Sequence, residues 1–192
     1  MNDTRADERK PAVAWAVAST SNPRQAFLGI SASAWIISYD GWQTVAVNNC
    51  LTSKEPNRHQ WYANVKSILG VIETVEDGAD VTIYTPEKTI ADLYPTGWRR
   101  SNGTEAVAFD AAQDLYRVAA EKRLTVRLVF QSPDDRAKNL TKSAKAQADA
   151  RYNELSDAEL WAAPIAPNAK NKRGKRLAFP ALTKGSSEVD DY

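Results

Sequence analysis

Residues 61–84, WYANVKSILGVIETVEDGADVTIY, contain the pattern that decides the fold. In the first part of this stretch, apolar side chains recur every three or four residues, at Trp61, Val65, Ile68, Leu69, Ile72 and Val75. This spacing places them on one side of a helix, as expected for a helix that packs on a sheet. The helix is expected to end near Asp77-Gly78, and Val81–Tyr84 then predicts a buried strand.

Three more strands are expected before this helix. Val13–Ala18, Phe27–Ser38 and Trp42–Cys50 are short runs rich in apolar, β-branched and aromatic residues. Asp40-Gly41 lies between the second and third runs, and both residues tolerate positive φ, so they predict a tight hairpin. The first part of the sheet is therefore expected to be antiparallel.

Beyond Tyr84 the pattern predicts further helices and one more strand. A short helix is expected over Pro86–Leu93, a longer one over Asp110–Lys122, a strand over Leu124–Phe130 and an Ala-rich polar helix over Leu140–Leu155. The helical crossovers would make this side of the sheet parallel. The order of elements therefore indicates an α/β protein with a mixed sheet.

The chain of 192 residues suits one domain with two tails. We expect a flexible charged segment over residues 1–10 and the domain over residues 11–155. Residues 156–192 are expected to form a short helix followed by a basic disordered tail. Ser156 and Glu159 have the spacing of a capping box, and little periodicity follows Pro164.

Composition limits the classes of function. The formal net charge is +1, so the whole chain is not a general polyanion binder. Cys50 is the single cysteine, which excludes an internal disulfide and fits a cytoplasmic location. One cysteine and one histidine cannot form a zinc site without carboxylates.

The first ten residues lack a secretion signal, and no apolar run is long enough to span a bilayer, so no membrane partner is expected.

Four short segments resemble the ribonuclease H family, in the order in which that family has them. Asn57–Ala63 (NRHQWYA) is similar to the N-x-R-x-E-x-x-A motif of its first helix, and Tyr84–Glu87 (YTPE) to Y-T-D-S at the end of its fourth strand. Gly97–Gly103 (GWRRSNG) is similar to its G-W-K…N-G segment, and Asp114–Tyr116 (DLY) to D-L-W. The resemblance covers about residues 12–152. It implies a ribonuclease H-like fold, a mixed five-stranded sheet in the order 3-2-1-4-5 flanked by helices.

Members of this family cleave the RNA strand of an RNA–DNA hybrid with two divalent metals held by four carboxylates. The resemblance places those four positions at Ser19 (within Ala18-Ser19-Thr20), Gln60, Pro86 and Lys145. None of these residues is an acid. The resemblance therefore implies a degenerate site with no bound metal and no cofactor.

Several residues remain that could contact nucleic acid. The resemblance places Asn57 and Arg58 in a turn that contacts the hybrid, and Trp98, Arg99, Arg100 and Asn102 in a segment that grips the DNA backbone. A Trp ring can stack and an Arg can bind a phosphate through two donors, while Lys145 could attract a phosphate without metal. In the tail, Lys172, Arg173, Lys175 and Arg176 could neutralise phosphates. The ordinary alternatives are a half-buried Trp, solvated cations and a solubilising tail.

These observations lead to a main hypothesis and two alternatives. The main hypothesis is a catalytically degenerate ribonuclease H-like protein that binds an RNA–DNA hybrid, a duplex or a nucleoprotein complex. The first alternative is an active enzyme that uses Mg²⁺ or Mn²⁺ on acids supplied anew by Glu87, Asp134 or Asp135. The second alternative is a protein–protein interaction module. The sequence leaves the oligomeric state open.

Overall fold

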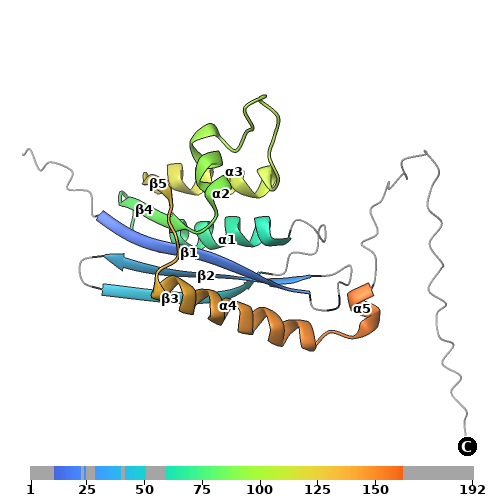
Figure 1. The fold of residues 1–192 in the computed structure, drawn as a ribbon. Coiled ribbons are helices and arrows are strands. Elements are labelled where there is room, and N and C mark those ends of the chain that lie inside the picture. Colours follow the sequence, from blue (N-terminus) through green and yellow to red (C-terminus); the bar gives the residue numbers. More distant parts are fainter. Residues whose placement is uncertain (1–10, 23, 25–28, 40–41, 51–58, 162–192) are drawn as a thin grey trace, which may run out of the picture.

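The computed structural model describes residues 11–22, 24, 29–39, 42–50 and 59–161. For Tyr39, residues 42–50 and His59 it describes the backbone alone. Figure 1 shows a twisted sheet with helices on both faces. In the described part of the chain no helix combines the length and the apolar character needed to cross a membrane.

Five strands form the sheet: β1 (Pro11–Ser21), β2 (Ile30–Tyr39), β3 (Trp42–Cys50), β4 (Asp80–Thr85) and β5 (Thr125–Phe130). Their order is β3-β2-β1-β4-β5. β2 pairs antiparallel with β1 and β3, whereas β4 pairs parallel with β1 and β5. The predicted mixed sheet and its strand order are therefore confirmed.

The helices are α1 (His59–Thr74), α2 (Lys88–Leu93), α3 (Phe109–Glu121), α4 (Asp135–Asn153) and α5 (Asp157–Trp161), with a 3₁₀ turn, η2 (Tyr94–Thr96), after α2. α1 and α3 pack on one face of the sheet, and α4 crosses β1, β2 and β3 on the other (Figure 1). α4 starts five residues earlier than predicted because the Asp134 side chain caps its first turn, accepting a bond from the Ala137 N–H at 2.7 Å.

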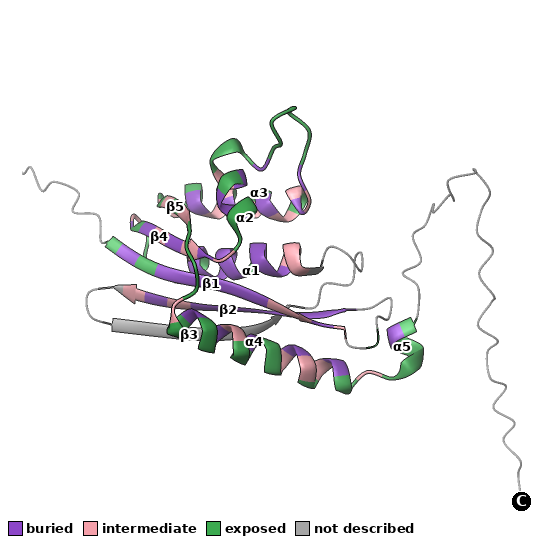
Figure 2. Cartoon of the chain, viewed as in Figure 1, coloured by how far each residue is buried: buried purple, intermediate pink, exposed green. Residues whose placement is uncertain are grey.

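The larger core lies between the sheet and α1 with α3. The predicted apolar side of α1 faces this core, and Val65, Ile68 and Ile72 are fully buried (Figure 2). Gly70 of α1 lies directly against the Trp35 ring of β2, where a Cβ would come within 2.5 Å of the indole. The absence of a side chain at residue 70 therefore lets helix and sheet approach closely.

A second core lies under α4 and is built from small residues. Ala137, Leu140, Ala144 and Ala148 recur along one side of α4 and pack on Trp15, Val17, Ala32 and Ala34. β1 is therefore buried on both faces, with even-numbered residues toward α1 and odd-numbered residues from Trp15 toward α4.

The chain continues from α4 into α5 through the predicted capping box. Ser156 N–H donates to Glu159 at 2.9 Å, and Glu159 N–H donates back to the Ser156 hydroxyl at 3.3 Å. Leu160 of α5 packs with Tyr152 and Ile30, so this short helix is attached to the domain. The tail segments predicted as flexible, residues 1–10 and 162–192, lie outside the described residues.

Candidate nucleic-acid interface

Gln60, in the first turn of α1, forms a closed set of hydrogen bonds with the end of β1. The Thr20 hydroxyl donates to Gln60 Oε1 at 2.7 Å, and Gln60 Nε2 donates to the Ala18 carbonyl at 3.0 Å. Thr20 Oγ1 also lies 2.9 Å from Ser31 Oγ. Because the single Thr20 proton is used on Gln60, Ser31 must be the donor in that second bond.

This arrangement requires an amide at residue 60. A glutamate there would turn a carboxylate oxygen toward the Ala18 carbonyl oxygen in place of the N–H donor. Two acceptors would then face each other in a partly buried space, which is unfavourable. The surroundings of residue 60 therefore suit the neutral residue that the sequence has.

Lys145 reaches the same end of β1 from α4. Its Nζ lies 3.4 Å from the Thr20 carbonyl and 2.6 Å from Asp149 Oδ1. The Lys145 ammonium hydrogen-bonds to Asp149 and so holds the pKa of that carboxyl below its ordinary value. The Lys145 side chain is still 47% exposed, so the ammonium can be reached from solvent.

The structure thus brings three of the four proposed degenerate positions to one place. Ser19 lies between the bonded residues Ala18 and Thr20, with Gln60 and Lys145 beside them. Pro86 follows the end of β4. The β1–β4 register pairs Trp15 with Tyr84, so its continuation places Pro86 level with Val17. Pro86 is therefore about 7 Å before Ser19 along the sheet, at roughly 3.3 Å per residue.

Burial corrects the expectation for Trp98. Its side chain is fully buried, and its indole N–H donates to the Val107 carbonyl at 2.7 Å. Gly97 and Trp98 both have positive φ, so the backbone turns and carries the ring into the core. Trp98 has no free face on which a base could stack.

The polar neighbours of Trp98 are exposed. Arg99 lies over the Phe109 ring at 4.9 Å and donates to the Gly103 carbonyl at 3.1 Å. Asn102 accepts bonds from the N–H and the hydroxyl of Thr104, so it holds a turn. Arg100 is exposed beside them, so a phosphate could reach its guanidinium.

The remaining predicted contacts fall in other parts of the chain. Asn57 and Arg58 lie outside the described residues, as do Lys172, Arg173, Lys175 and Arg176 of the tail.

The three acids proposed for a rebuilt metal site have separate surroundings. Asp134 caps α4, and Asp135 lies 3.3 Å from Lys138. Glu87 is exposed and precedes α2. Within the described ranges, no three His, Cys, Asp or Glu side chains gather in a way that could hold a metal ion.

Comparison with known proteins shows that the fold of this chain is similar to that of solved structures. No sequence-family model matches the chain, and no curated protein matches it. Solved structures do match. The N-terminal ribonuclease H domain of a Mycobacterium tuberculosis protein, solved as a fusion with maltose-binding protein, has a TM-score of 0.53 at 8% identity, covering 74% of this chain and 99% of that one. The chain has a ribonuclease H-like fold.

Two further structures agree with this ribonuclease H-like fold. The ribonuclease H domain of PFV has a TM-score of 0.53 at 8% identity, covering 74% of this chain and 96% of its own. A foamy viral protease–reverse transcriptase in complex with dsDNA has a TM-score of 0.50 at 12% identity, covering 74% and 95%. At these identities the likeness concerns the fold alone.

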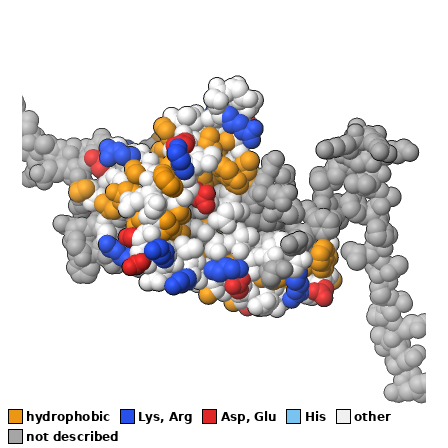
Figure 3. All heavy atoms as spheres, in the orientation of Figure 1, with side chains coloured by type: hydrophobic (Ala, Val, Ile, Leu, Met, Phe, Trp, Pro, Cys, Tyr) orange, Lys and Arg blue, Asp and Glu red, His pale blue; other side chains and the backbone are white. Residues whose placement is uncertain are grey.

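α4 of this ribonuclease H-like domain carries a row of cations that was not predicted as a group from the sequence. Five lysines and arginines lie between Asp135 and Asn153, and among the described residues all of them except Lys142 form surface ion pairs, with Asp134, Asp135, Asp149 or Glu154. Lys138, Lys142 and Lys145 recur at helical spacing on the exposed side, opposite the buried alanines. Figure 3 shows lysine and arginine side chains along α4. The three- and four-residue spacing of these lysines was the available sequence signal.

Proposed function

We propose that this protein is a catalytically degenerate ribonuclease H-like protein that binds nucleic acid without a metal ion. The observation that carries the proposal is the bonded group of Thr20, Gln60 and Lys145. The residues at the positions where the family resemblance expects carboxylates are neutral or cationic, and the one carboxylate bonded to them, Asp149, is paired with Lys145 at 2.6 Å. Such a group cannot offer the hard anionic ligands that Mg²⁺ needs, but it can accept an anion.

The exposed lysines of α4 extend this group into a longer cationic surface. Lys138, Lys142 and Lys145 are all exposed along one side of the helix, so a phosphate backbone could follow it. Each phosphate that these lysines neutralise would release counterions, so the affinity should fall with salt. The salt bridges of Lys138 and Lys145 are on the surface and worth about 0–1 kcal/mol each, so they would yield to a phosphate.

The likeness in fold supports the same class of ligand. The foamy viral protein that shares the fold was solved with dsDNA, and the family that the sequence resembles acts on RNA–DNA hybrids. We propose a hybrid or duplex as the ligand, alone or in a nucleoprotein complex. We also propose that the protein acts in the cytoplasm, as the single cysteine suggests.

A mobility-shift titration tests the proposal. The full chain is mixed with matched RNA–DNA hybrid, DNA duplex and RNA duplex at 50 and 200 mM salt. Binding should be measurable at low salt and weaker at high salt. Lys142→Ala should weaken binding to every ligand and flatten the salt dependence by about one counterion. Lys66→Ala, an exposed lysine on α1, is the matched control and should leave binding unchanged.

Two results would contradict the proposal. Absence of binding to all three ligands at low salt would remove nucleic acid as the partner and favour the protein–protein module. Cleavage of the hybrid that requires Mg²⁺ or Mn²⁺ and disappears in Glu87→Gln or Asp134→Asn would instead support the active enzyme with rebuilt acids.

A further inference from the structure

Among the described residues, no helix packs on the α4 side of β4 and β5. α4 packs over β1, β2 and β3. On β4, Val81 and Ile83 belong to the core on the α1 side, so Thr82 and Tyr84 point to the α4 side. On β5, Val126 and Leu128 pack on that same core, so Arg127 and Val129 also point to the α4 side. Figure 1 shows α4 on the β1–β3 part of the sheet, away from β4 and β5.

Strand register arranges this face in two rows. Trp15 pairs with Tyr84, which pairs with Val129, and these three make an aromatic and apolar row. The next row joins Val13 to Thr82 and Thr82 to Arg127. Val13 is 44% exposed, which is unusual for a valine in a central strand. We call these two rows the open sheet face.

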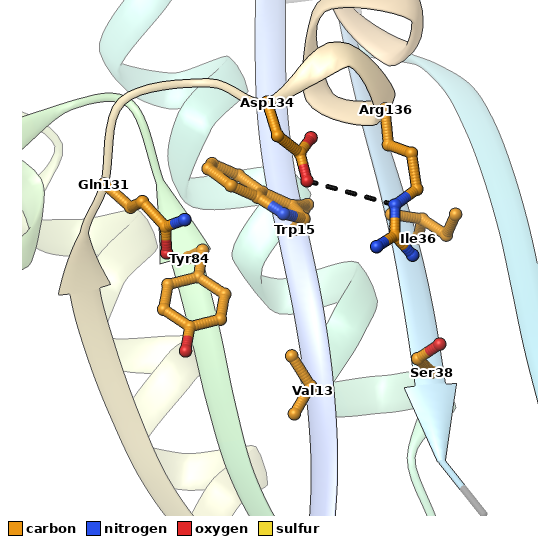
Figure 4. Close-up of a pocket in the computed structure, with 8 residues that line it drawn as sticks. All are labelled: Val13, Trp15, Ile36, Ser38, Tyr84, Gln131, Asp134 and Arg136. Carbon is orange, nitrogen blue, oxygen red and sulfur yellow. Dashed lines mark ion pairs between the residues drawn. The ribbon is translucent and has the colours of Figure 1, made fainter. Parts of the chain in front are cut away.

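A pocket of about 200 Å³ lies where the open sheet face meets the start of α4. Val13, Trp15, Ile36 and Tyr84 supply its apolar and aromatic walls, and its polar lining residues are Ser38, Gln131, Asp134 and Arg136. Figure 4 shows Gln131 and Arg136 on opposite sides of Trp15. The Trp15 and Tyr84 ring centroids are 5.5 Å apart and the rings are tilted by 42°. Pockets for whole drug-sized ligands measure about 300–1,000 Å³, so this one suits a single ring system.

The chemistry of this pocket selects a planar ring that carries negative charge nearby. Tyr84 is half-buried and offers part of a ring for stacking, and the Gln131 amide can both donate to and accept from a ring edge. Two exposed arginines lie on this side of the sheet: Arg136 lines the pocket, and Arg127 lies one row away from the rings, level with Thr82. The Asp134 carboxylate is occupied by the Ala137 N–H at 2.7 Å and lies 3.9 Å from Arg136.

We infer that the open sheet face binds an unpaired nucleotide, with the base in the Trp15–Tyr84 pocket and its phosphate near Arg136 or Arg127. An apolar side chain of a protein would fill the pocket but offer no anion to Arg127, and it would leave Arg136 with only its 3.9 Å ion pair to Asp134. The inference rests on the proposed function and adds a preference for single-stranded ends beside a duplex. Tyr84, Gln131 and Arg136 were not among the contacts predicted from the sequence.

Fluorescence anisotropy with two matched DNA duplexes tests the inference. One duplex is blunt, and the other has the same paired region and a four-nucleotide overhang. The full chain should bind the overhang duplex about tenfold more tightly, since stacking of one base on an aromatic ring is worth about that factor. Tyr84→Leu should remove this gain and leave the blunt-duplex affinity unchanged. Arg117→Ala, an exposed arginine on α3 at the other face, should keep the gain.

The outcomes separate this inference from the proposed function. Equal binding of both duplexes overturns the inference while the proposed function stands. The inference also fails if Tyr84→Leu weakens both duplexes equally with its circular dichroism unchanged. Failure of both DNA duplexes to bind overturns the inference, and the proposed function falls with it only if the RNA–DNA hybrid and the RNA duplex also fail to bind. The open sheet face could instead hold a second copy of this chain. Sedimentation would then show a dimer that Tyr84→Leu dissociates, and the overhang would bring no gain in affinity. That result also overturns the inference.

Discussion

At the scale of single residues, the amide of Gln60 gives the clearest reason why this ribonuclease H-like chain would lack a metal site. The family resemblance located the residue, but it could not show that Thr20 and Ala18 would bond both ends of its amide. Those partners come from β1, about 40 residues earlier, and only the packing of α1 on the sheet brings them close. Local sequence does not contain that information.

Gln60→Glu should destabilise the protein by about 1–2 kcal/mol at pH 7, because the carboxylate loses the donor to Ala18 and faces a carbonyl oxygen. The folded state would raise the pKa of the new glutamate above its ordinary value of about 4.3. The loss of stability is therefore complete above the pKa of the glutamate in the folded state. It shrinks as the pH falls through that pKa and is small below about pH 4. Urea unfolding of the variant and the wild type at pH 7 and at about pH 4 measures the loss.

The matched control is Gln113→Glu, because Gln113 is an exposed glutamine on α3. It should change stability by less than about 0.5 kcal/mol at either pH. Equal unfolding midpoints for Gln60→Glu and wild type at pH 7 would contradict the account of the site.

Gly70→Ala should destabilise the protein by about 1–3 kcal/mol, although alanine is the better helix former. The added Cβ would lie 2.5–2.7 Å from three carbons of the Trp35 ring. Trp35→Phe removes the outer part of that ring, so the same glycine substitution should cost less in this background. A thermal unfolding series of the four variants measures the coupling, and additive effects would rule out the clash as the cause.

The burial of Trp98 could not be predicted from the sequence. The sequence segment resembles one that grips DNA, but the ring is buried and bonded to Val107, nine residues away. Burial of this kind depends on how the loop between α2 and α3 folds back. A pattern of residue types cannot reveal it, whereas the exposure of Arg99 and Arg100 was predictable from their charge.

At the scale of elements, periodicity predicted the helices that pack on the sheet because each buries one side, and short apolar and β-branched runs predicted the strands, of which β1 is buried on both faces. α1 and α3 begin and end within a few residues of their predicted bounds. α4 was predicted to start at Leu140, because its Ala-rich inner side gives a weak apolar signal before that residue. The Asp134 cap followed by Ala137 was the missed start signal.

One connection between elements carries a testable contribution to stability. Lys122, which follows α3, donates from Nζ to the Glu73 carbonyl at 2.8 Å and to the Val75 carbonyl, at the carboxyl end of α1. These carbonyls have no partner within the helix, and a cation there is favoured by the helix dipole. The Lys122 side chain is 21% exposed.

Lys122→Met should therefore lower the free energy of unfolding by about 1–2 kcal/mol, with the apolar stem retained. Lys66→Met, at an exposed position of α1 itself, serves as the control and should have little effect. Guanidinium unfolding followed by circular dichroism compares the two. Equal losses for both variants would mean that Lys122 does not act through the end of α1.

At the scale of the whole molecule, charge is distributed along the chain in a way that the net value of +1 hides. Cations gather along α4, and α4 also brings Lys145 to the end of β1 beside Gln60. The sheet then continues past α4 into the open sheet face. A duplex along α4 and an unpaired end on that face would use neighbouring surfaces of one domain.

Metal dependence of nucleic-acid binding tests the central claim most directly. Binding of an RNA–DNA hybrid is measured by anisotropy in EDTA and again in 10 mM Mg²⁺ or Mn²⁺, and the integrity of the RNA strand is checked on a gel. We predict equal affinity in EDTA and in Mg²⁺ at matched ionic strength, with the RNA strand intact throughout. Binding that requires the divalent ion, accompanied by RNA cleavage, would contradict the account.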